Sequence, residues 1–171
     1  MKSLNLAILL ALGVAYLPSL AFADDREALI GTWKITLFHD DGNDRLSRLG
    51  AGPAKKEKPA RVAKLVFTAD DCFLIRRDGR REMASGLTNA GWKSITLDET
   101  TTPKSIDIVG FAGKENERTK TYPGIYELAG DTLRICYPEY GSQRPTKFES
   151  NGNDNLFECE RISKEPLPVP E

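Results

Sequence analysis

The chain is poor in the side chains from which catalytic and metal sites are usually built. Its 171 residues include one histidine and three cysteines, and no two cysteines form a Cys-x-x-Cys pair. Nucleophilic triads and most structural metal sites need imidazole or thiolate groups close together. The single histidine, His39, ends an alternating segment, where a solvated side chain at the end of a strand is the simpler interpretation. We therefore expect no catalytic residue set.

Motifs for nucleotides and metals are also missing. The Gly–Lys pair within residues 110–114 lacks the spacing and the following hydroxyl residue of a P-loop. Residues 40–44 offer several carboxylate and amide oxygens, but not at the spacing of a calcium loop. No Gly-x-Ser-x-Gly or His-Glu-x-x-His motif occurs. The sequence predicts a protein without enzymatic activity, metal or cofactor.

Only one long hydrophobic run is present, and it lies at the N-terminus. Lys2 precedes an apolar stretch over residues 4–20, and Ala21-Phe22-Ala23 fits the small-x-small pattern of a cleavage site. The run is too short and too weakly flanked by charge for a confident membrane span, and a retained anchor is the alternative. We expect a signal peptide over residues 1–23, export to the periplasm or the extracellular space, and no membrane span after cleavage.

No charge of either sign dominates. Lysine and arginine total 24 against 25 aspartates and glutamates, which gives a net charge of −1. A nucleic-acid-binding protein needs a basic face, so a dedicated role of that kind is disfavoured.

The remaining chain has the size of one domain. We expect residues 24–164 to fold as that domain and residues 165–171, which include three prolines, to form an extended tail. Residues 40–60 are rich in glycine, proline, lysine and aspartate, and they predict a long mobile loop.

Short alternating segments separated by turn residues dominate the domain. The expected inward positions of three such segments are Trp33, Ile35 and Leu37; Leu65 and Phe67; and Ile106 and Ile108. A period of two predicts half-buried strands in an antiparallel sheet, sandwich or barrel. Only residues 24–29 favour a helix, of one or two turns.

The turn Asp78-Gly79 predicts the first of three hairpins and places Leu74 opposite Met83 and Phe73 opposite Ala84. The same register sets four arginines opposite one another in pairs, namely Arg77 with Arg80 and Arg76 with Arg81. These arginines are either an anion-binding patch at an exposed tip or a solvated hairpin whose charges block edge-to-edge pairing.

Two further hairpins are predicted. Gly130-Asp131 fits a turn with glycine first, and residues 151–154 form the loop of the other hairpin. The expected cross-strand pairs are Leu128 with Leu133, Tyr126 with Ile135, Glu127 with Arg134, Phe148 with Phe157, and Lys147 with Glu158. In both hairpins the apolar pairs share one face and an ion pair lies on the other, as half-buried hairpins require.

The three cysteines, Cys72, Cys136 and Cys159, are an odd number, and export would permit one disulfide. In the registers above, Cys159 shares the inward face with Phe157, whereas Cys136 shares the outward face with Arg134. A bridge between Cys136 and Cys159 is therefore disfavoured, and Cys72 could pair with either. Three small buried thiols are the alternative.

Five motifs in order carry a resemblance to a known family. They are Leu29-Ile30-Gly31-Thr32-Trp33, Pro103-Lys104-Ser105-Ile106-Asp107, Gly124-Ile125-Tyr126-Glu127-Leu128, Asp131-Thr132-Leu133-Arg134-Ile135-Cys136-Tyr137 and Arg144-Pro145-Thr146-Lys147-Phe148. Together they resemble uncharacterised, exported, lipocalin-like domains best known from planctomycete bacteria, over residues 29–162. The resemblance implies an antiparallel lipocalin-like β-barrel of about 8–10 strands and no established activity.

The resemblance also implies structural roles for Gly31, Trp33 and Arg161. In such barrels the tryptophan closes one end, and a cationic side chain from the last strand lies over its ring. Arg161 is the candidate for that cation here, and the contact would contribute about 0.5–2 kcal/mol.

A barrel of this size either holds one small ligand or fills its interior with side chains. Large residues expected at inward or mouth positions are the ligand-binding candidates: Phe67, Tyr126, Tyr137, Arg144, Phe148 and Phe157. Tyr137 and Arg144 each precede a proline, and anchoring of a loop is their alternative role. We expect a non-enzymatic binding module for a small apolar ligand; a cell-envelope interaction or structural domain with a filled core is the alternative.

Overall fold

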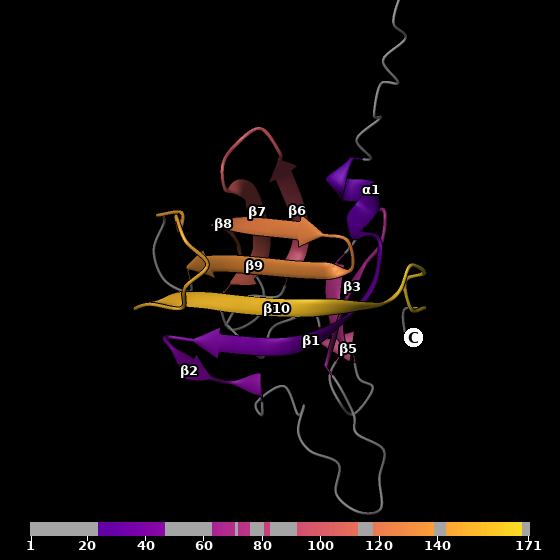
Figure 1. Cartoon of the computed structure of the whole chain (residues 1–171), viewed down its shortest axis with the longest axis horizontal. Coiled ribbons are helices and arrows are strands. Elements are labelled where there is room, and N and C mark those ends of the chain that lie inside the picture. The colour runs from indigo at the N-terminus through magenta and orange to yellow at the C-terminus, as the bar shows by residue number, and fades with distance from the viewer. Residues whose placement is uncertain are drawn as a thin grey trace, which may run out of the picture.

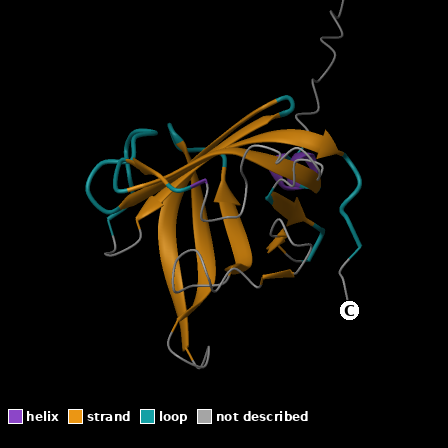
Figure 2. Cartoon of the chain, turned by 90° about the horizontal axis from the view of Figure 1, so that it is seen from below, coloured by secondary structure: helices purple, strands orange, loops and turns teal. Residues whose placement is uncertain are grey.

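Ten strands of the described chain form one antiparallel sheet that curls into an open half-barrel (Figures 1 and 2). The computed structural model describes residues 24–46, 63–70, 72–75, 81–82, 92–112, 118–138 and 143–168. The strands are β1 (Gly31–Asp40), β2 (Asn43–Asp44), β3 (Lys64–Phe67), β4 (Cys72–Ile75), β5 (Arg81–Glu82), β6 (Trp92–Asp98), β7 (Lys104–Ala112), β8 (Arg118–Ala129), β9 (Thr132–Pro138) and β10 (Asp154–Ser163). The prediction of a mostly antiparallel β fold is confirmed.

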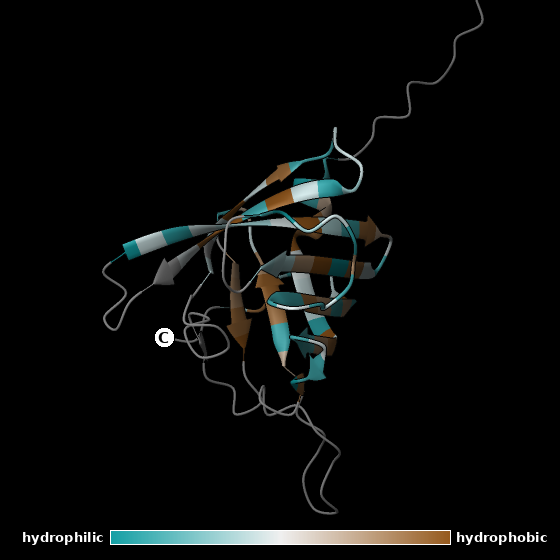
Figure 3. Ribbon diagram, turned by 90° about the vertical axis from the view of Figure 1, so that its left-hand side faces the viewer, coloured by the Kyte–Doolittle hydropathy of each residue, from teal (hydrophilic) through white to brown (hydrophobic). Residues whose placement is uncertain are grey.

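The first and last strands lie side by side in the middle of this sheet. The strand order is β5-β4-β3-β1-β10-β9-β8-β7-β6, and β2 adds to β1. β4 and β6, near opposite ends of this order, approach within 8 Å between Cα atoms, although the described residues form no ladder between them. The sheet therefore encloses a concave face that carries the main hydrophobic core, and hydrophobic and hydrophilic residues alternate along its strands (Figure 3).

The strand β1 changes face halfway along its length. Trp33 and Ile35 are buried on the concave face, as their alternation predicts. A bulge between Ile35 and Leu37 in the pairing with β10 then turns Phe38 inward. Leu37 packs on the convex face instead, so its predicted inward position is wrong. The extra residue of a bulge reverses the alternation that follows it.

The other two alternating segments bury their predicted inward residues. Ile106 and Ile108 of β7 are fully buried in the main core, and Leu65 and Phe67 of β3 join them there. Val66 is buried as well, but on the convex face, so β3 is covered on both sides.

The β8–β9 hairpin has its predicted register. The observed pairs are Tyr126 with Ile135, Glu127 with Arg134, and Leu128 with Leu133. Gly130 begins the turn with a φ of 60°, in the left-handed region that glycine tolerates best. The Glu127 carboxylate lies 3.3 Å from the Arg134 guanidinium on the convex face, which confirms the expected ion pair.

The predicted register of the β4–β5 hairpin is wrong by one residue. Leu74 pairs with Glu82 rather than with Met83, and Ile75 pairs with Arg81. Arg81 is therefore paired with Ile75 rather than with Arg76. Residues 76–80, with three of the four arginines of the expected anion patch, lie outside the described residues, as do residues 83 and 84.

The third predicted hairpin does not form. Phe157 of β10 pairs with Ile135 of β9 on one side and with Phe38 of β1 on the other. Phe148 belongs to a segment without strand structure, and Glu158 pairs with Arg134 instead of Lys147. β10 thus pairs with β9 and β1, and not with residues 143–150, which precede it in the sequence.

All three cysteines are buried and none forms a disulfide. Cys72 and Cys159 lie in the main core, as expected for Cys159. Cys136 points to the convex face, as predicted, but it is covered there by Leu156, Ile125 and the partly buried Phe148. Burial raises the pKa of the Cys136 thiol to about 12, so it stays protonated near neutral pH.

The beginning of the predicted C-terminal tail is attached to the sheet. The Thr32 hydroxyl donates to the Glu165 carbonyl at 3.1 Å and accepts from the Leu167 N–H at 3.1 Å. Leu167 packs on the convex cluster of Val66, Phe73 and Ile75. The tail therefore covers β3 and β4, and residues 169–171 lie outside the described residues.

The predicted N-terminal helix is confirmed as α1 (Asp25–Leu29), capped by the Asp24 carboxylate, which accepts from the Arg26 N–H at 2.8 Å. Within the described residues, no helix has the length and apolar character needed to cross a membrane. The expected signal peptide lies outside those residues, as does most of the expected loop over 40–60, although Asn43 and Asp44 of that range form β2.

Candidate functional site

Five aromatic rings line the concave face near the end of β1, and we call them the aromatic wall. They come from five strands and are Phe38, Trp92, Tyr122, Tyr137 and Phe157. Phe157 stacks on Phe38 with ring centroids 4.4 Å apart and on Tyr137 at 6.1 Å. Trp92 and Tyr122 meet Tyr137 edge-on at 5.7 and 6.1 Å. Stacked and edge-to-face contacts of this kind join the five buried rings into one apolar cluster.

Three polar side chains adjoin the aromatic wall, and we call Asp40, Arg45 and Asn155 the polar corner. Asn155 is paired in register with Asp40 on one side and with Tyr137 on the other. Because directly paired residues of neighbouring strands point to the same face, the Asn155 amide shares the concave face with Tyr137. Arg45 Nε lies 3.5 Å from Asp40 Oδ2, and the Arg45 N–H donates to the Phe38 carbonyl at 2.8 Å.

The amide of Asn155 is the least expected group in this region. Asn155 is 0% exposed, and in the described part of the chain neither its Nδ2 nor its Oδ1 has a hydrogen-bond partner. An unpaired buried amide costs about 1–3 kcal/mol, and nearly all buried polar groups in native proteins are paired. An apolar side chain of similar size would avoid this cost, so packing alone does not account for the amide.

Asn155 and Arg45 were not among the site residues predicted from the sequence. One signal was present, because Asn155, Phe157 and Cys159 occupy alternate positions and only the first is polar. That signal has no meaning until the strand is known to face a core on this side. Asp40 was considered only as part of a calcium loop.

At the opposite end of the concave face, Arg161 covers the ring of Trp33. The Arg161 guanidinium carbon lies 3.9 Å from the centroid of the Trp33 ring, so the expected cation–π contact is present. Arg161 also donates to the carbonyls of Ala28 at 2.6 Å and Ile30 at 2.9 Å, and the Trp33 indole N–H donates to Leu29 at 2.8 Å. These bonds hold the end of α1 against the sheet.

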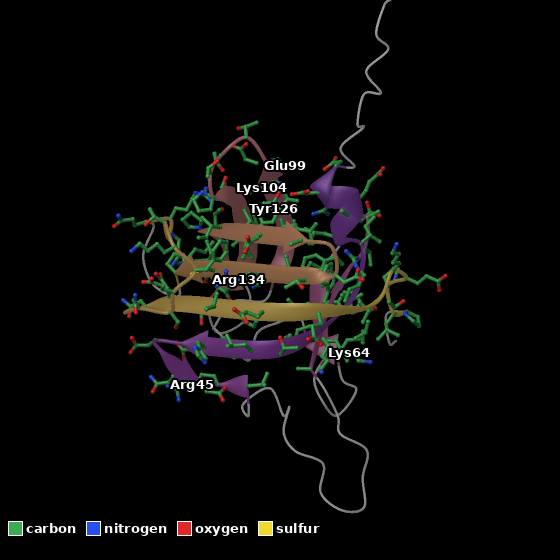
Figure 4. All side chains as sticks on the ribbon, in the orientation of Figure 1. Arg45, Lys64, Glu99, Lys104, Tyr126 and Arg134 are labelled. Atoms are coloured by element: carbon green, nitrogen blue, oxygen red, sulfur yellow. The ribbon has the colours of Figure 1, made fainter. Side chains whose placement is uncertain are left out.

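A second polar cluster holds the start of α1. Asp25 Oδ2 accepts from Lys104 Nζ at 2.6 Å and from the Tyr126 hydroxyl at 2.7 Å. Glu99 accepts from the Asp25 N–H at 2.9 Å, and Figure 4 shows Glu99, Lys104 and Tyr126 close together. Burial, together with the bond to Asp25, raises the pKa of Tyr126 well above its usual range. A surface cleft of about 320 Å³ adjoins the cluster and includes Phe148 in its wall.

Replacing Tyr126 by phenylalanine is expected to lower the free energy of unfolding by about 1–2 kcal/mol, because a hydrogen bond to a charged carboxylate is lost. Urea unfolding of Tyr126→Phe, Asp25→Asn and the double variant measures the coupling between the two residues. We expect a coupling of about 1 kcal/mol. Single-variant effects that simply add would show that the hydroxyl does not stabilise α1 through Asp25.

The structure brings only some of the predicted ligand-binding residues together. Tyr137 and Phe157 lie in the aromatic wall. Tyr126 and Phe67 are buried in the same core but nearer the Trp33 end, where Phe67 is paired with Gly31. Tyr126 is occupied by its bond to Asp25. Tyr126 and Phe67 therefore lie apart from the aromatic wall, and Tyr126 also lines the cleft of about 320 Å³.

Two predicted ligand-binding residues lie outside the barrel interior. Phe148 packs on the convex face, beneath the Arg134 guanidinium at 4.7 Å from its ring. Arg144 donates to the carbonyls of Ile106 and Gly124 and to Asp107 Oδ1, the last at 2.6 Å. Arg144 thus anchors its loop, which was the alternative role considered for it. The misplacement of Phe148 follows from the third hairpin, which does not form.

Among the described residues, no group of three or more His, Cys, Asp or Glu side chains is placed to hold a metal ion. No family model, no curated protein and no solved structure matches the chain.

Proposed function

We propose that this protein is an exported, non-enzymatic binding module of lipocalin type that holds a small, mainly apolar ligand against the aromatic wall. The observation that carries the proposal is the buried, unpaired amide of Asn155 beside that wall. Small-molecule sites combine an apolar lining with a few well-placed polar groups. The aromatic wall supplies the lining, and the polar corner supplies the polar groups.

The lipocalin-type assignment is supported by the contact between Trp33 and Arg161. These two residues are paired across β1 and β10, and the guanidinium lies over the indole ring, as the family resemblance implies. The ligand would enter at the other end of the concave face, beside Asp40 and Asn155.

Export is supported by the expected signal peptide and by the contacts that follow its expected cleavage site. Asp24 caps α1, and Asp25 joins the cluster with Lys104 and Tyr126. Cleavage after Ala23 would leave both of these residues in the mature chain. The expected location is the periplasm or the extracellular space.

A second candidate function has its own supporting observation. The rings of the aromatic wall contact one another, and none is more than 6% exposed. A barrel filled in this way would be a structural or interaction domain of the cell envelope without a ligand.

The neutral fluorescent probe N-phenyl-1-naphthylamine distinguishes the two candidates. With protein purified after export, we expect a saturable rise in probe fluorescence at one site per chain, because the naphthyl ring leaves water for the aromatic wall. Benzophenone should displace the probe and, on irradiation, form adducts within peptides that cover residues 133–138 and 154–158.

The control for this experiment is the folded state of the same sample, followed by near-ultraviolet circular dichroism. A folded protein that gives no saturable signal would contradict ligand binding and favour the filled-core domain. Adducts confined to peptides around Trp33 would place binding at the Trp33 end of the barrel and contradict a site at the aromatic wall.

A further inference from the structure

We propose that the ligand carries an uncharged head group with a hydrogen-bond donor and an acceptor side by side, as in a primary carboxamide or a lactam, and that this group pairs with Asn155. The inference rests on the proposed function and names the class of ligand that the aromatic wall and polar corner would take.

The hydrogen-bonding capacity of Asn155 sets the first requirement. Its Nδ2 donates and its Oδ1 accepts, and in the described residues both atoms are unpaired. A primary amide or lactam presents the same two functions in the reverse order, so two parallel hydrogen bonds form at once. A carboxylate only accepts, and it would leave Oδ1 facing another oxygen atom. An ammonium group only donates, and it would leave Nδ2 without an acceptor.

The charges of the polar corner set the second requirement. Arg45 and Asp40 lie 3.5 Å apart between Nε and Oδ2, so their charges largely compensate each other next to Asn155. Arg45 Nε is buried and makes no hydrogen bond within the described residues. A charged head group would lose its hydration here without a free opposite charge, which is costly in a buried site. A neutral head group avoids that cost.

Lys120 of β8 is a further cation near the aromatic wall. Its ammonium lies over the Tyr122 ring, 4.8 Å from the centroid. Tyr122 belongs to β8, which is separated from β10 by β9 in the sheet. Lys120 is therefore placed to interact with the outer edge of the aromatic wall rather than with a group that pairs with Asn155.

The aromatic wall sets the third requirement. Tyr137 is directly opposite Asn155, and Phe157 lies two residues further along β10 on the same face. A ligand paired with the amide would lay its body across these rings. Flat apolar bodies suit such a surface, because stacked and edge contacts add to the gain from burial.

Three naphthalene derivatives with one ring system and different head groups test the inference. They are 2-naphthamide, 2-naphthoate and N,N-dimethyl-2-naphthamide, and each is measured by displacement of N-phenyl-1-naphthylamine from the exported protein. We expect 2-naphthamide to bind at least ten-fold more tightly than the other two. A ten-fold ratio corresponds to about 1.4 kcal/mol. In Asn155→Leu the ratio should fall to near one, because the variant has neither the donor nor the acceptor.

Two further variants keep the test decisive. Asn155→Asp retains the size of the side chain but loses the donor, so it should also lose the preference for 2-naphthamide. Asn153→Leu changes an exposed asparagine two residues earlier and should keep that preference. Urea unfolding should show Asn155→Leu to be at least as stable as the parent protein, since an unpaired amide is removed.

The possible outcomes separate the two proposals. Probe binding without a preference for 2-naphthamide, or a preference that survives in Asn155→Leu or Asn155→Asp, overturns the inference and leaves the binding function standing. Tightest binding of 2-naphthoate overturns the uncharged head group and points to Lys120 or Arg45 as an anion partner. Failure of the probe itself to bind the folded protein overturns the proposed function first.

Discussion

Replacing Trp33 by alanine is expected to lower the free energy of unfolding by about 3–5 kcal/mol, the usual cost of removing a large aromatic ring from a core. Trp33 is fully buried, and its indole N–H donates to the Leu29 carbonyl. The same change removes the ring beneath Arg161, so one substitution affects the core, α1 and the last strand together. Chemical denaturation monitored by circular dichroism measures the loss.

The variant Trp33→Phe separates the packing contribution from the hydrogen bond. Phenylalanine keeps an aromatic face for the Arg161 guanidinium but loses the indole N–H and part of the volume. We expect this variant to lie between the parent protein and Trp33→Ala in stability. Equal stability of Trp33→Ala and the parent protein would show that this end of the barrel does not contribute to folding.

Replacing Gly31 by alanine is expected to destabilise the fold by about 2–6 kcal/mol, since backbone strain and overpacking each cost about 1–3 kcal/mol. Gly31 has a φ of 138°, which side-chain-bearing residues rarely adopt. A methyl group on its Cα would lie 2.4 Å from the Ser163 carbonyl oxygen, a backbone atom of the adjacent strand. Either β1 or β10 must therefore move.

The matched control for Gly31 is Gly152 in the loop before β10. Gly152 has a φ of 66°, and an added methyl group would meet no atom within 4 Å among the described residues. Gly152→Ala should cost only the conformational strain, about 1–2 kcal/mol. If thermal unfolding shows equal losses for the two variants, the close approach of Gly31 to Ser163 is not what limits substitution.

Local sequence signals were sufficient where a short turn joins two strands. The turn at Gly130 fixes which residues face each other across β8 and β9, because a two-residue loop leaves no freedom of register. The same logic failed for β10, whose partners are β9 and the distant β1. Nothing in the residues beside β10 encodes a partner at the other end of the chain. Phe148 was misplaced for that reason.

The candidate site was harder to predict than the fold. Leu37 and Phe38 exchange roles because of a single bulge, and alternation alone cannot show where one residue is skipped. Asn155 stands out only after Tyr137 and Phe157 are known to share its face. By contrast, the contact between Trp33 and Arg161 was expected from the family resemblance, because it depends on two fixed positions at the two ends of the domain.

The central position of β10 has a consequence for how the chain folds. β1 leads to β3, β4 and β5 on one side, whereas β9 leads to β8, β7 and β6 on the other, and β10 joins the two sets. A nascent chain that ends before Asp154 therefore holds two separate partial sheets with exposed apolar faces. Pairings between distant parts of a chain form slowly, because a long loop must close first. The half-barrel is completed only when the last strand is inserted between β9, which is synthesised shortly before it, and β1, which is synthesised at the start of the domain.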